Sequence, residues 1–259
     1  MEVKPISMYE EREFLKENSN VKKGDIVFAT AVQFIEPILF CDVNGRDALM
    51  FVEDIDDSDY KTKKLRTAKA LVGKKLLARV LRIENEMIIL ERRTVIKDTC
   101  EYLKNNVGKI IECTVNSIAY CGIFVDIGNG LVSLIPNVEI SKSRCYDWSL
   151  YFNYDNVLKV KILNYDTENG VFHLSRKGAY DVMTEETLPR GSVIIVSVHK
   201  YVDEAKSGVY VEYDPANTGI MDIPDGVKPD KFYETRRAVA IVKTVKPQKG
   251  IKVVFSKFV

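Results

Sequence analysis

The side chains that most often perform catalysis or hold metal ions are few and scattered in this chain. There are two histidines, His173 and His199, and five cysteines, at positions 41, 100, 113, 121 and 145. A zinc site needs thiolate or imidazole ligands at short spacing, and no C-x-x-C pair occurs. The acidic run 54–59 lacks the glycine and terminal glutamate of an EF-hand loop. We therefore expect no metal, no cofactor, and free thiols in a reducing compartment.

Sequence motifs of the common enzyme classes are also missing. The chain contains no G-x-x-x-x-G-K-[ST], no G-x-G-x-x-G, no G-x-S-x-G and no H-E-x-x-H. With two isolated histidines, a nucleophile has no evident general base. The sequence therefore predicts a protein that is not an enzyme.

The charge balance narrows the class of partner. The chain has 38 Lys plus Arg and 37 Asp plus Glu, a net charge of +1. Duplex-DNA coats and polybasic arms rely on a large positive excess, which is absent here. Binding of single-stranded nucleic acid remains open, because one local basic groove and stacked aromatic rings suffice. The charged start of the chain and the lack of a long apolar run predict a cytoplasmic protein without signal peptide or membrane span.

The elements that must position any site recur three times along the chain. Each repeat opens with a glycine and a β-branched run, at Gly24, Gly108 and Gly191, so the period is about 84 residues. Each repeat closes with two paired strands, within 76–93, 158–177 and 238–257. A period of this length with strand-type content is typical of tandem domains.

Another strand pair lies inside each repeat, within 38–55, 122–136 and 207–224. Turns such as Asn44-Gly45 and Asn169-Gly170 are hairpin signals, because glycine accepts the positive φ that these turns need. Five short strands with a longer polar segment between the third and fourth are the strand count of an OB fold. The sequence predicts an all-β chain of three tandem five-stranded OB-fold barrels joined by short helical linkers.

Charged, helix-type segments separate the repeats, at 92–106 and 176–188, and a third precedes the first repeat at 9–20. The predicted organisation follows from these segments. It comprises an N-terminal helical segment (1–21), a first barrel (22–95), a helical linker (96–106), a second barrel (107–178), a linker (179–188) and a third barrel (189–259).

The central repeat carries an ordered series of short motifs. They are Val107-Gly108-Lys109, the GIFVDIG run at 122–128, Leu134-Ile135-Pro136, Glu139-Ile140-Ser141 and Leu174-Ser175-Arg176-Lys177. In this order and at these separations, residues 106–178 resemble the S1 RNA-binding domain, named for the largest protein of the bacterial small ribosomal subunit. The flanking repeats are similar in their opening glycine and closing hairpin, so the resemblance extends over about residues 22–258.

The resemblance implies where RNA would bind. In that family, single-stranded RNA lies across strands two and three, stacks on rings near the glycine and touches basic side chains around it. Phe124 matches the ring two residues after Gly122, and Tyr120 lies close to the other stacking position. The cations expected to contact phosphate are Lys161, Arg176 and Lys177.

The flanking repeats offer further candidates. In the first, Phe34 and Phe40 flank Glu36-Pro37, where the ring-bearing turn would fall. Its closing hairpin is the most basic part of the chain, but Arg79 and Arg82 have an odd offset and are expected on opposite strand faces, so only a subset, including Arg79, can line a groove. In the third repeat, Tyr210 and Arg236 are the candidates.

The predicted function is binding of single-stranded RNA, associated with translation, by several weak barrels acting together. The expected partners are single-stranded RNA and the ribosome or RNA polymerase machinery. The alternative is a protein-interaction or assembly scaffold that uses the barrels without RNA. The near-neutral charge favours this alternative, as do Cys121 and Pro136 at positions where the family commonly carries a ring and a histidine. An accessory factor in transcription or RNA processing is a third hypothesis.

Overall fold

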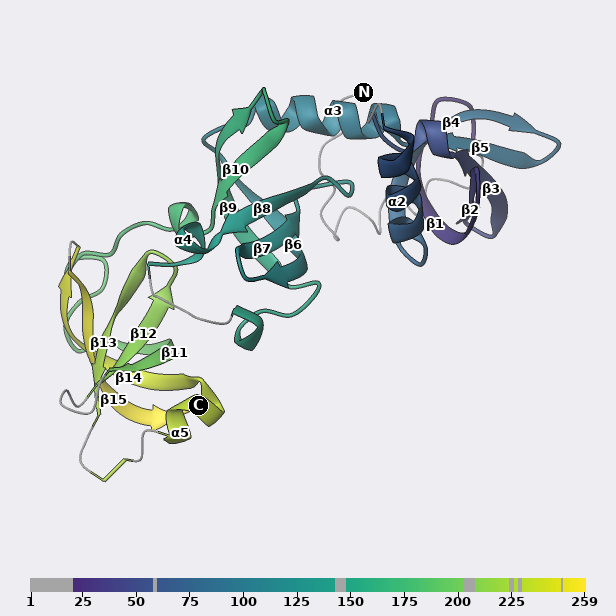
Figure 1. Ribbon diagram of the computed structural model, residues 1–259. Coiled ribbons are helices and arrows are strands. Elements are labelled where there is room, and N and C mark those ends of the chain that lie inside the picture. The colour runs from purple at the N-terminus through teal and green to yellow at the C-terminus, as the bar shows by residue number, and fades with distance from the viewer. Residues whose placement is uncertain are drawn as a thin grey trace. The chain divides into compact units, whose positions relative to one another are not determined.

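The computed structural model describes residues 21–57, 60–142, 148–202, 208–223, 226–227, 230–247 and 249–259. The predicted N-terminal helical segment, 1–21, lies outside these residues except for Val21. The chain divides into two compact units, residues 1–106 with 126–132, and residues 107–125 with 133–259. The predicted fold class is confirmed, because three five-stranded β units follow one another with short helices between them (Figure 1).

The first β unit is a closed barrel with the strand order β1-β2-β3-β5-β4. Its strands are β1 (Ile26–Ile35), β2 (Ile38–Val43), β3 (Arg46–Phe51), β4 (Lys75–Glu84) and β5 (Met87–Glu91). The predicted turn at Asn44 and Gly45 is confirmed, with φ of 53° and 79°. Asparagine and glycine reach this left-handed region at low cost, so the turn can join two adjacent antiparallel strands.

Alternating burial places the core of this barrel. On β2, Leu39, Cys41 and Val43 are buried while their neighbours are more exposed. Between β3 and β4, where the sequence indicated only a polar segment, the chain forms the 3-10 turn η1 (Val52–Asp54) and the helix α2 (Lys61–Leu71). α2 packs Ala68 and Leu71 against the core at a spacing of three residues, which is the helical period that sequence reasoning missed.

The predicted first linker helix is confirmed as α3 (Arg93–Lys104). The carboxylate of Glu91 accepts a 2.9 Å hydrogen bond from the backbone N–H of Thr94, which would otherwise lack an acceptor in the first turn. Val95 of α3 is buried with Leu77 of β4. The helix is therefore fixed to the outer face of the first barrel by apolar packing as well as by its capping carboxylate.

The second β unit is a five-stranded sheet, in the order β10-β9-β6-β7-β8, that curls into a nearly closed barrel (Figure 1). Its strands are β6 (Ile110–Ala119), β7 (Gly122–Asp126), β8 (Val132–Pro136), β9 (Val157–Asp166) and β10 (Val171–Ser175). Three short helical segments accompany it: α4 (Asn137–Ile140), η2 (Trp148–Leu150) and η3 (Lys177–Ala179).

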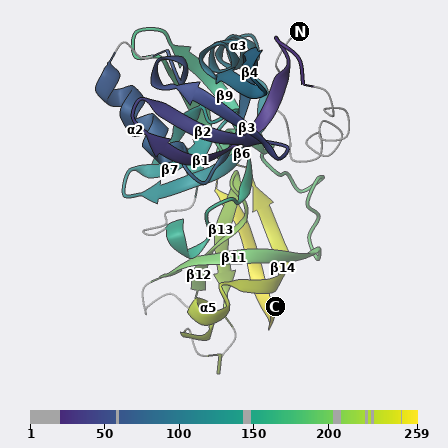
Figure 2. The same ribbon diagram turned by 90° about the vertical axis from the view of Figure 1, so that its right-hand side faces the viewer.

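The third β unit is a closed barrel with the order β11-β12-β13-β15-β14. Its strands are β11 (Val193–Val202), β12 (Gly208–Asp214), β13 (Asn217–Asp222), β14 (Arg237–Lys246) and β15 (Gly250–Phe258). The helix α5 (Asp230–Thr235) lies beside β14 (Figure 2). Its buried Phe232 packs against Phe255 and Phe258, with ring centroids 5.0 and 4.8 Å away.

The predicted second linker helix, over 176–188, is wrong, because the chain there forms only the turn η3 before it becomes irregular. The irregular part has other partners for its backbone. The Asn217 side chain donates to the Asp181 carbonyl at 2.8 Å and accepts from the Met183 N–H at 2.7 Å. Leu188 is buried in the third barrel's core. Long-range contacts therefore replace the hydrogen bonds of a helix. In the described part of the chain, no helix is long and apolar enough to cross a membrane.

Candidate nucleic-acid interface

The β7–β8 pair of the second barrel is shaped by the glycine that begins β7. Gly122 has a φ of 150°, and a Cβ at this position would overlap the backbone carbonyl oxygen of Ile135 on β8. Only glycine allows the two strands to approach this closely. The spacing of β7 and β8, the strands expected to bind RNA, therefore requires a glycine at position 122.

Tyr120 lies in the turn between β6 and β7, and 96% of its surface is exposed. The Asn137 side chain at the start of α4 donates to the Tyr120 carbonyl at 2.7 Å, and its oxygen accepts from the indole N–H of Trp148 at 3.1 Å. The Asn137 backbone N–H donates to the Cys121 carbonyl at 3.1 Å. Three hydrogen bonds through one asparagine therefore hold the backbone that presents the Tyr120 ring.

Sequence reasoning missed Asn137 and Trp148 as positioning residues. Asn137 directly follows Pro136 in a motif that was recognised, but its partners lie 17 and 11 residues away. No local pattern signals such a bond, because side-chain amides reach partners only after the strands have paired.

Phe124 lies on the outer face of β7. It is half-buried and alternates with Ile123 and Val125, which are fully buried in the core. Because successive side chains of a strand point to opposite faces, the ring of Phe124 faces away from the barrel interior. It can offer part of its surface to a base on the same strand pair that Tyr120 precedes.

Lys161 is the predicted cation of this barrel without an internal partner. It lies on β9, opposite Ile110 of β6 and Ser175 of β10. It is half-buried, and no carboxylate of the described residues pairs with it. Its ammonium group remains available for a phosphate.

Arg176 has a different setting. Its guanidinium lies 3.3 Å from the carboxylate of Glu212 on β12, and only 12% and 8% of the two side chains are exposed. Glu212 also accepts a hydrogen bond from the Ser141 hydroxyl, and Arg176 lies over the ring of Phe152, 4.9 Å from its centroid. This arginine therefore joins the second and third barrels inside the second unit.

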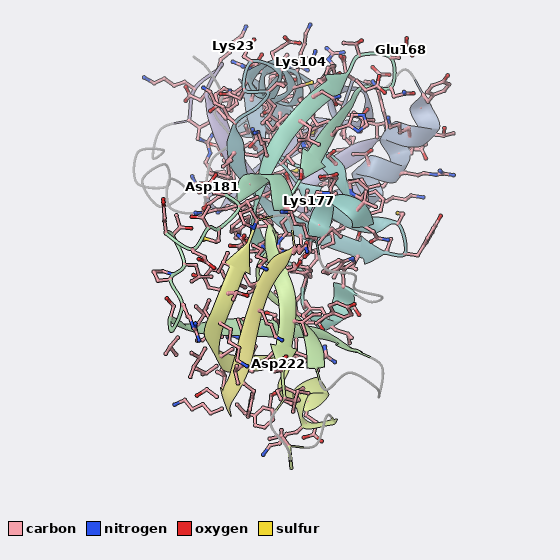
Figure 3. All side chains as sticks on the ribbon, turned by 90° about the vertical axis from the view of Figure 1, so that its left-hand side faces the viewer. Lys23, Lys104, Glu168, Lys177, Asp181 and Asp222 are labelled. Atoms are coloured by element: carbon pink, nitrogen blue, oxygen red, sulfur yellow. The ribbon has the colours of Figure 1, made fainter. Side chains whose placement is uncertain are left out.

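Lys177 is also held by the protein itself. Its ammonium group donates to the Val138 carbonyl at 2.7 Å and lies 3.2 Å from the Glu139 carboxylate. Lys177, labelled in Figure 3, thus holds α4 next to η3. The same helix begins at Asn137, so Lys177 supports the turn that carries Tyr120.

In the first barrel, the two candidate rings lie on either side of the β1–β2 turn. Phe34, the residue before the last of β1, pairs with Leu39, and Phe40 on β2 pairs with Gln33. Both rings are half-buried, and Phe34 packs against the barrel core. Their exposed edges can meet a base.

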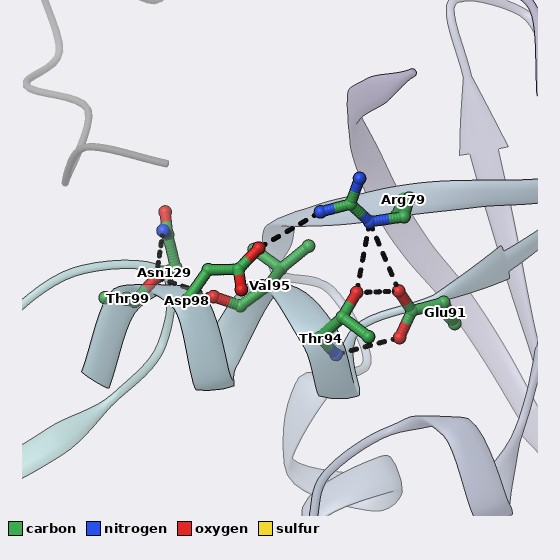
Figure 4. A network of polar contacts seen from close by, with 7 residues as sticks. All are labelled: Arg79, Glu91, Thr94, Val95, Asp98, Thr99 and Asn129. Carbon is green, nitrogen blue, oxygen red and sulfur yellow. Dashed lines mark hydrogen bonds and ion pairs between the residues drawn. The ribbon is translucent and has the colours of Figure 1, made fainter. Parts of the chain in front are cut away.

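Arg79 belongs to a polar network at the junction of β4 and α3 (Figure 4). It donates to the Thr94 hydroxyl and to the Asp98 carboxylate, both at 3.1 Å, and lies 3.6 Å from Glu91. The Thr94 hydroxyl also donates to Glu91. The network neutralises Arg79 while it fixes the first turn of α3.

The prediction that Arg79 and Arg82 face opposite sides of their strand is wrong. Arg79 pairs with Glu91 and Arg82 with Ile89, two residues apart on β5, so both arginines lie on one face. The register shifts between Val80 and Arg82, where β4 contains one extra residue. Such a bulge resets the two-residue alternation of a strand.

Arg92, part of the basic hairpin, is buried in the first unit rather than exposed. It donates to the Asn129 carbonyl at 2.8 Å and to the Ile55 carbonyl at 3.4 Å. Burial lowers the pKa of Arg92 and raises the pKa of the nearby Asp126, whose carboxylate accepts backbone hydrogen bonds from Gly128 and Gly130. This cation therefore has a structural role.

The third barrel presents Tyr210 on β12, with 43% of its surface exposed. Arg236 donates to the Leu150 carbonyl at 2.6 Å and lies over the Tyr151 ring, 5.8 Å from its centroid. The Tyr151 hydroxyl in turn donates to the Val198 carbonyl at 2.6 Å. Tyr210 thus remains accessible, whereas Arg236 contributes to the contact between the second and third barrels.

Across the residues that the structure describes, no three His, Cys, Asp or Glu side chains form a group that could hold a metal ion. The accessible candidates of this barrel are two rings and Lys161, which can bind bases and phosphates.

Comparison with known proteins adds three findings. Residues 104–177 match the family S1 RNA binding domain. The small ribosomal subunit protein bS1 of Leuconostoc lactis is 28% identical over 227 residues, covering 80% of this chain and 49% of that protein. The bS1 homolog of Bacillus subtilis strain 168 is 28% identical over 220 residues, covering 81% and 52%. The chain spans about half the length of the curated relatives it matches.

A partial similarity also reaches an enzyme. The 4-hydroxy-3-methylbut-2-enyl diphosphate reductase of Clostridium acetobutylicum is 27% identical over 147 residues, which are 53% of this chain and 22% of that protein. The similarity covers a minor part of the reductase.

Proposed function

We propose that this protein binds single-stranded RNA without catalysing a reaction on it. The grounds are the S1 RNA-binding domain in the chain and its distant relationship to bS1 over most of the chain's length. The observation that carries the proposal is the exposed ring of Tyr120 beside β7 in the matched domain. Because 96% of the Tyr120 surface is exposed to water, stacking of a base on one face of the ring would contribute favourable binding free energy.

We assign Phe124, on the strand that follows Tyr120, to the same site, and Lys161 on β9 as a further contact in the same barrel. Stacking on an aromatic ring contributes about 1–3 kcal/mol per base, so two rings can hold two unpaired bases. Lys161 supplies a phosphate contact, since Arg176 and Lys177 have partners within the protein. With one main cation in the site, binding depends weakly on salt, at a slope of about −0.7 per phosphate contact for a single strand.

The flanking barrels add weak contacts of the same kind. Tyr210 in the third barrel and the edges of Phe34 and Phe40 in the first are accessible rings. When several weak sites lie on one chain, the later binding events are intramolecular, and the combined affinity exceeds that of each site. We propose that the RNA is messenger RNA, that the larger partner is the translation machinery, and that the protein acts in the cytoplasm.

The test is fluorescence anisotropy of a labelled single-stranded RNA of about 12 nucleotides, a length within the usual site size of such barrels. Tyr120→Ala should weaken binding about 5-fold to 150-fold, the equivalent of one lost stacking contact. The matched control is Tyr154→Ala, which removes another exposed tyrosine of the same barrel, 58% exposed, far along the chain from β7. Absence of binding by the unmodified chain at low salt, or equal affinities of the two variants, would refute the proposal.

A protein-interaction or assembly scaffold is the second candidate for the flanking barrels. It is supported by Arg79 and Arg236, the candidate cations of these barrels, which both contact other parts of the chain. A pull-down after nuclease treatment separates the two functions, because a scaffold retains its protein partner and an RNA-dependent assembly loses it.

A further inference from the structure

A cavity of about 250 Å³ lies in the second unit, and neither Tyr120 nor Phe124 is among its lining residues. Its wall combines the β12–β13 and β14–β15 turns of the third barrel with Met183 of the linker and Lys142, which follows α4. Three of its lining residues are lysines, Lys142, Lys246 and Lys249, and none is acidic.

The cavity depends on contacts that fix its walls. The backbone N–H of Lys142 donates to the Pro215 carbonyl at 2.9 Å, which brings the end of α4 to the β12–β13 turn. The side-chain oxygen of Asn217 accepts a 2.7 Å hydrogen bond from the backbone N–H of Met183, which holds the linker at the other wall. A Cβ on Gly250 would overlap the Thr218 carbonyl oxygen, so the β14–β15 turn can lie against β13 only with glycine there.

The floor is apolar and the rim is cationic. Ala216, Val245 and Ile251 are buried, whereas Lys142, Lys246 and Lys249 are exposed. Side chains of this kind can cover a sugar or base while ammonium groups meet a phosphate, because lysine binds phosphate as a compact point charge.

Lys142, Lys246 and Lys249 differ from two other lysines of the third barrel. Lys243 and Lys252 both lie close to the Asp222 carboxylate, at 3.2 and 3.4 Å. Among the described residues, no carboxylate pairs with any of the three lysines at the cavity. The nearby Asp214 accepts hydrogen bonds from Ala216 and Asn217 within its own turn. Within the described residues, the three lysines at the cavity therefore form no ion pair of their own.

We propose that this cavity binds the phosphate monoester of a single nucleotide, either the terminal phosphate of an RNA strand or that of a free nucleotide. Its volume is below the roughly 300–1,000 Å³ of sites for drug-sized ligands, so it takes one phosphorylated unit rather than several nucleotides. A doubly charged monoester meets three ammonium groups, whereas a backbone diester carries one charge. The site is separate from stacking at Tyr120 and can exist without it.

The experiment compares the full chain's affinity for the trinucleotide UUU carrying a 5′-phosphate with that for the same trinucleotide ending in a 5′-hydroxyl, both labelled at the 3′ end. We expect the phosphorylated form to bind about tenfold more tightly. The triple variant Lys142→Gln, Lys246→Gln, Lys249→Gln should lose this preference. The matched control, Lys23→Gln, Lys63→Gln, Lys69→Gln, removes three exposed lysines of the first unit and should retain it.

Competition by uridine monophosphate then identifies the source of the phosphate. Displacement of the phosphorylated trinucleotide at a similar concentration assigns the cavity to free nucleotides, and a phosphate preference without displacement assigns it to RNA ends. Equal binding of the two trinucleotides together with no binding of uridine monophosphate overturns the proposal, as does a preference that survives the cavity triple variant. Tyr120→Ala should keep the preference, so failure of stacking and failure of the cavity give different results.

Discussion

Replacing Glu212 by glutamine should destabilise the second unit strongly, because it leaves the charge of Arg176 buried. The two side chains are 12% and 8% exposed and their charged atoms are 3.3 Å apart. At this distance their attraction is about 5 kcal/mol for an effective dielectric constant of about 20. Desolvation of both ions offsets most of it, but removal of one partner leaves that cost without the attraction. The expected loss in free energy of unfolding is about 3–5 kcal/mol.

The pair also predicts a rescue. Within the described residues the Nε of Arg176 has no hydrogen-bond partner, so the buried pair is incompletely compensated. Replacing both partners, by Arg176→Met and Glu212→Leu, removes both desolvation costs and should recover at least half of the stability lost in Glu212→Gln. The matched control is Lys243→Met, which breaks an exposed pair with Asp222 in the same unit and should cost less than about 1 kcal/mol.

Urea unfolding can be followed through the fluorescence of Trp148, the single tryptophan of the chain. This residue is buried, and its ring centroid is 5.9 Å from that of Phe152, the ring beneath Arg176. A loss in Glu212→Gln no larger than that in Lys243→Met would show that the buried charge of Arg176 does not depend on Glu212. So would a double variant whose destabilisation equals the sum of those of Arg176→Met and Glu212→Leu, each made alone.

Two further predictions concern the barrels themselves. Gly122→Ala should destabilise the second barrel by roughly several kcal/mol, because the new Cβ would overlap the Ile135 carbonyl. The control is Gly24→Ala, where φ is 91° but no atom lies near, and it should cost only about 1 kcal/mol in the same urea titration. Equal costs of the two variants would show that the close approach of β7 and β8 is unimportant. Burial raises the pKa of Cys41 to about 12, so at pH 9 roughly one thiol in a thousand is ionised, and iodoacetamide should leave Cys41 unmodified in the native chain by mass spectrometry. Rapid alkylation of Cys41 in the native chain would contradict the raised pKa. Because the pKa of Cys41 is higher in the folded than in the unfolded chain, the free energy of unfolding should also fall as pH rises from about 9 to 12.

The secondary structure was largely predictable, because its signals are local. Asn44-Gly45 indicates a turn by residue types alone, and the alternation Leu39, Cys41, Val43 indicates a strand with one buried face. Three repeats of such signals were enough for three five-stranded barrels. The local rule failed where an extra residue entered β4 and placed Arg79 and Arg82 on one face. A bulge is decided by how two strands pair, so neither strand indicates it alone.

The types of side chain in the candidate site were predictable, but their availability was not. Tyr120 and Lys161 are accessible, whereas Arg176 faces Glu212, a residue 36 positions away on another barrel. The second linker is likewise irregular because Asn217 binds its backbone from 34 and 36 positions away. The turns, the strands and the three repeats can be read from the amino-acid sequence, since they depend on backbone conformations and alternation within a few residues. The folded arrangement alone sets which cations are neutralised, which rings reach water and where the lysine-rimmed cavity forms, because electrostatic pairing and burial depend on groups that meet only after the chain has folded.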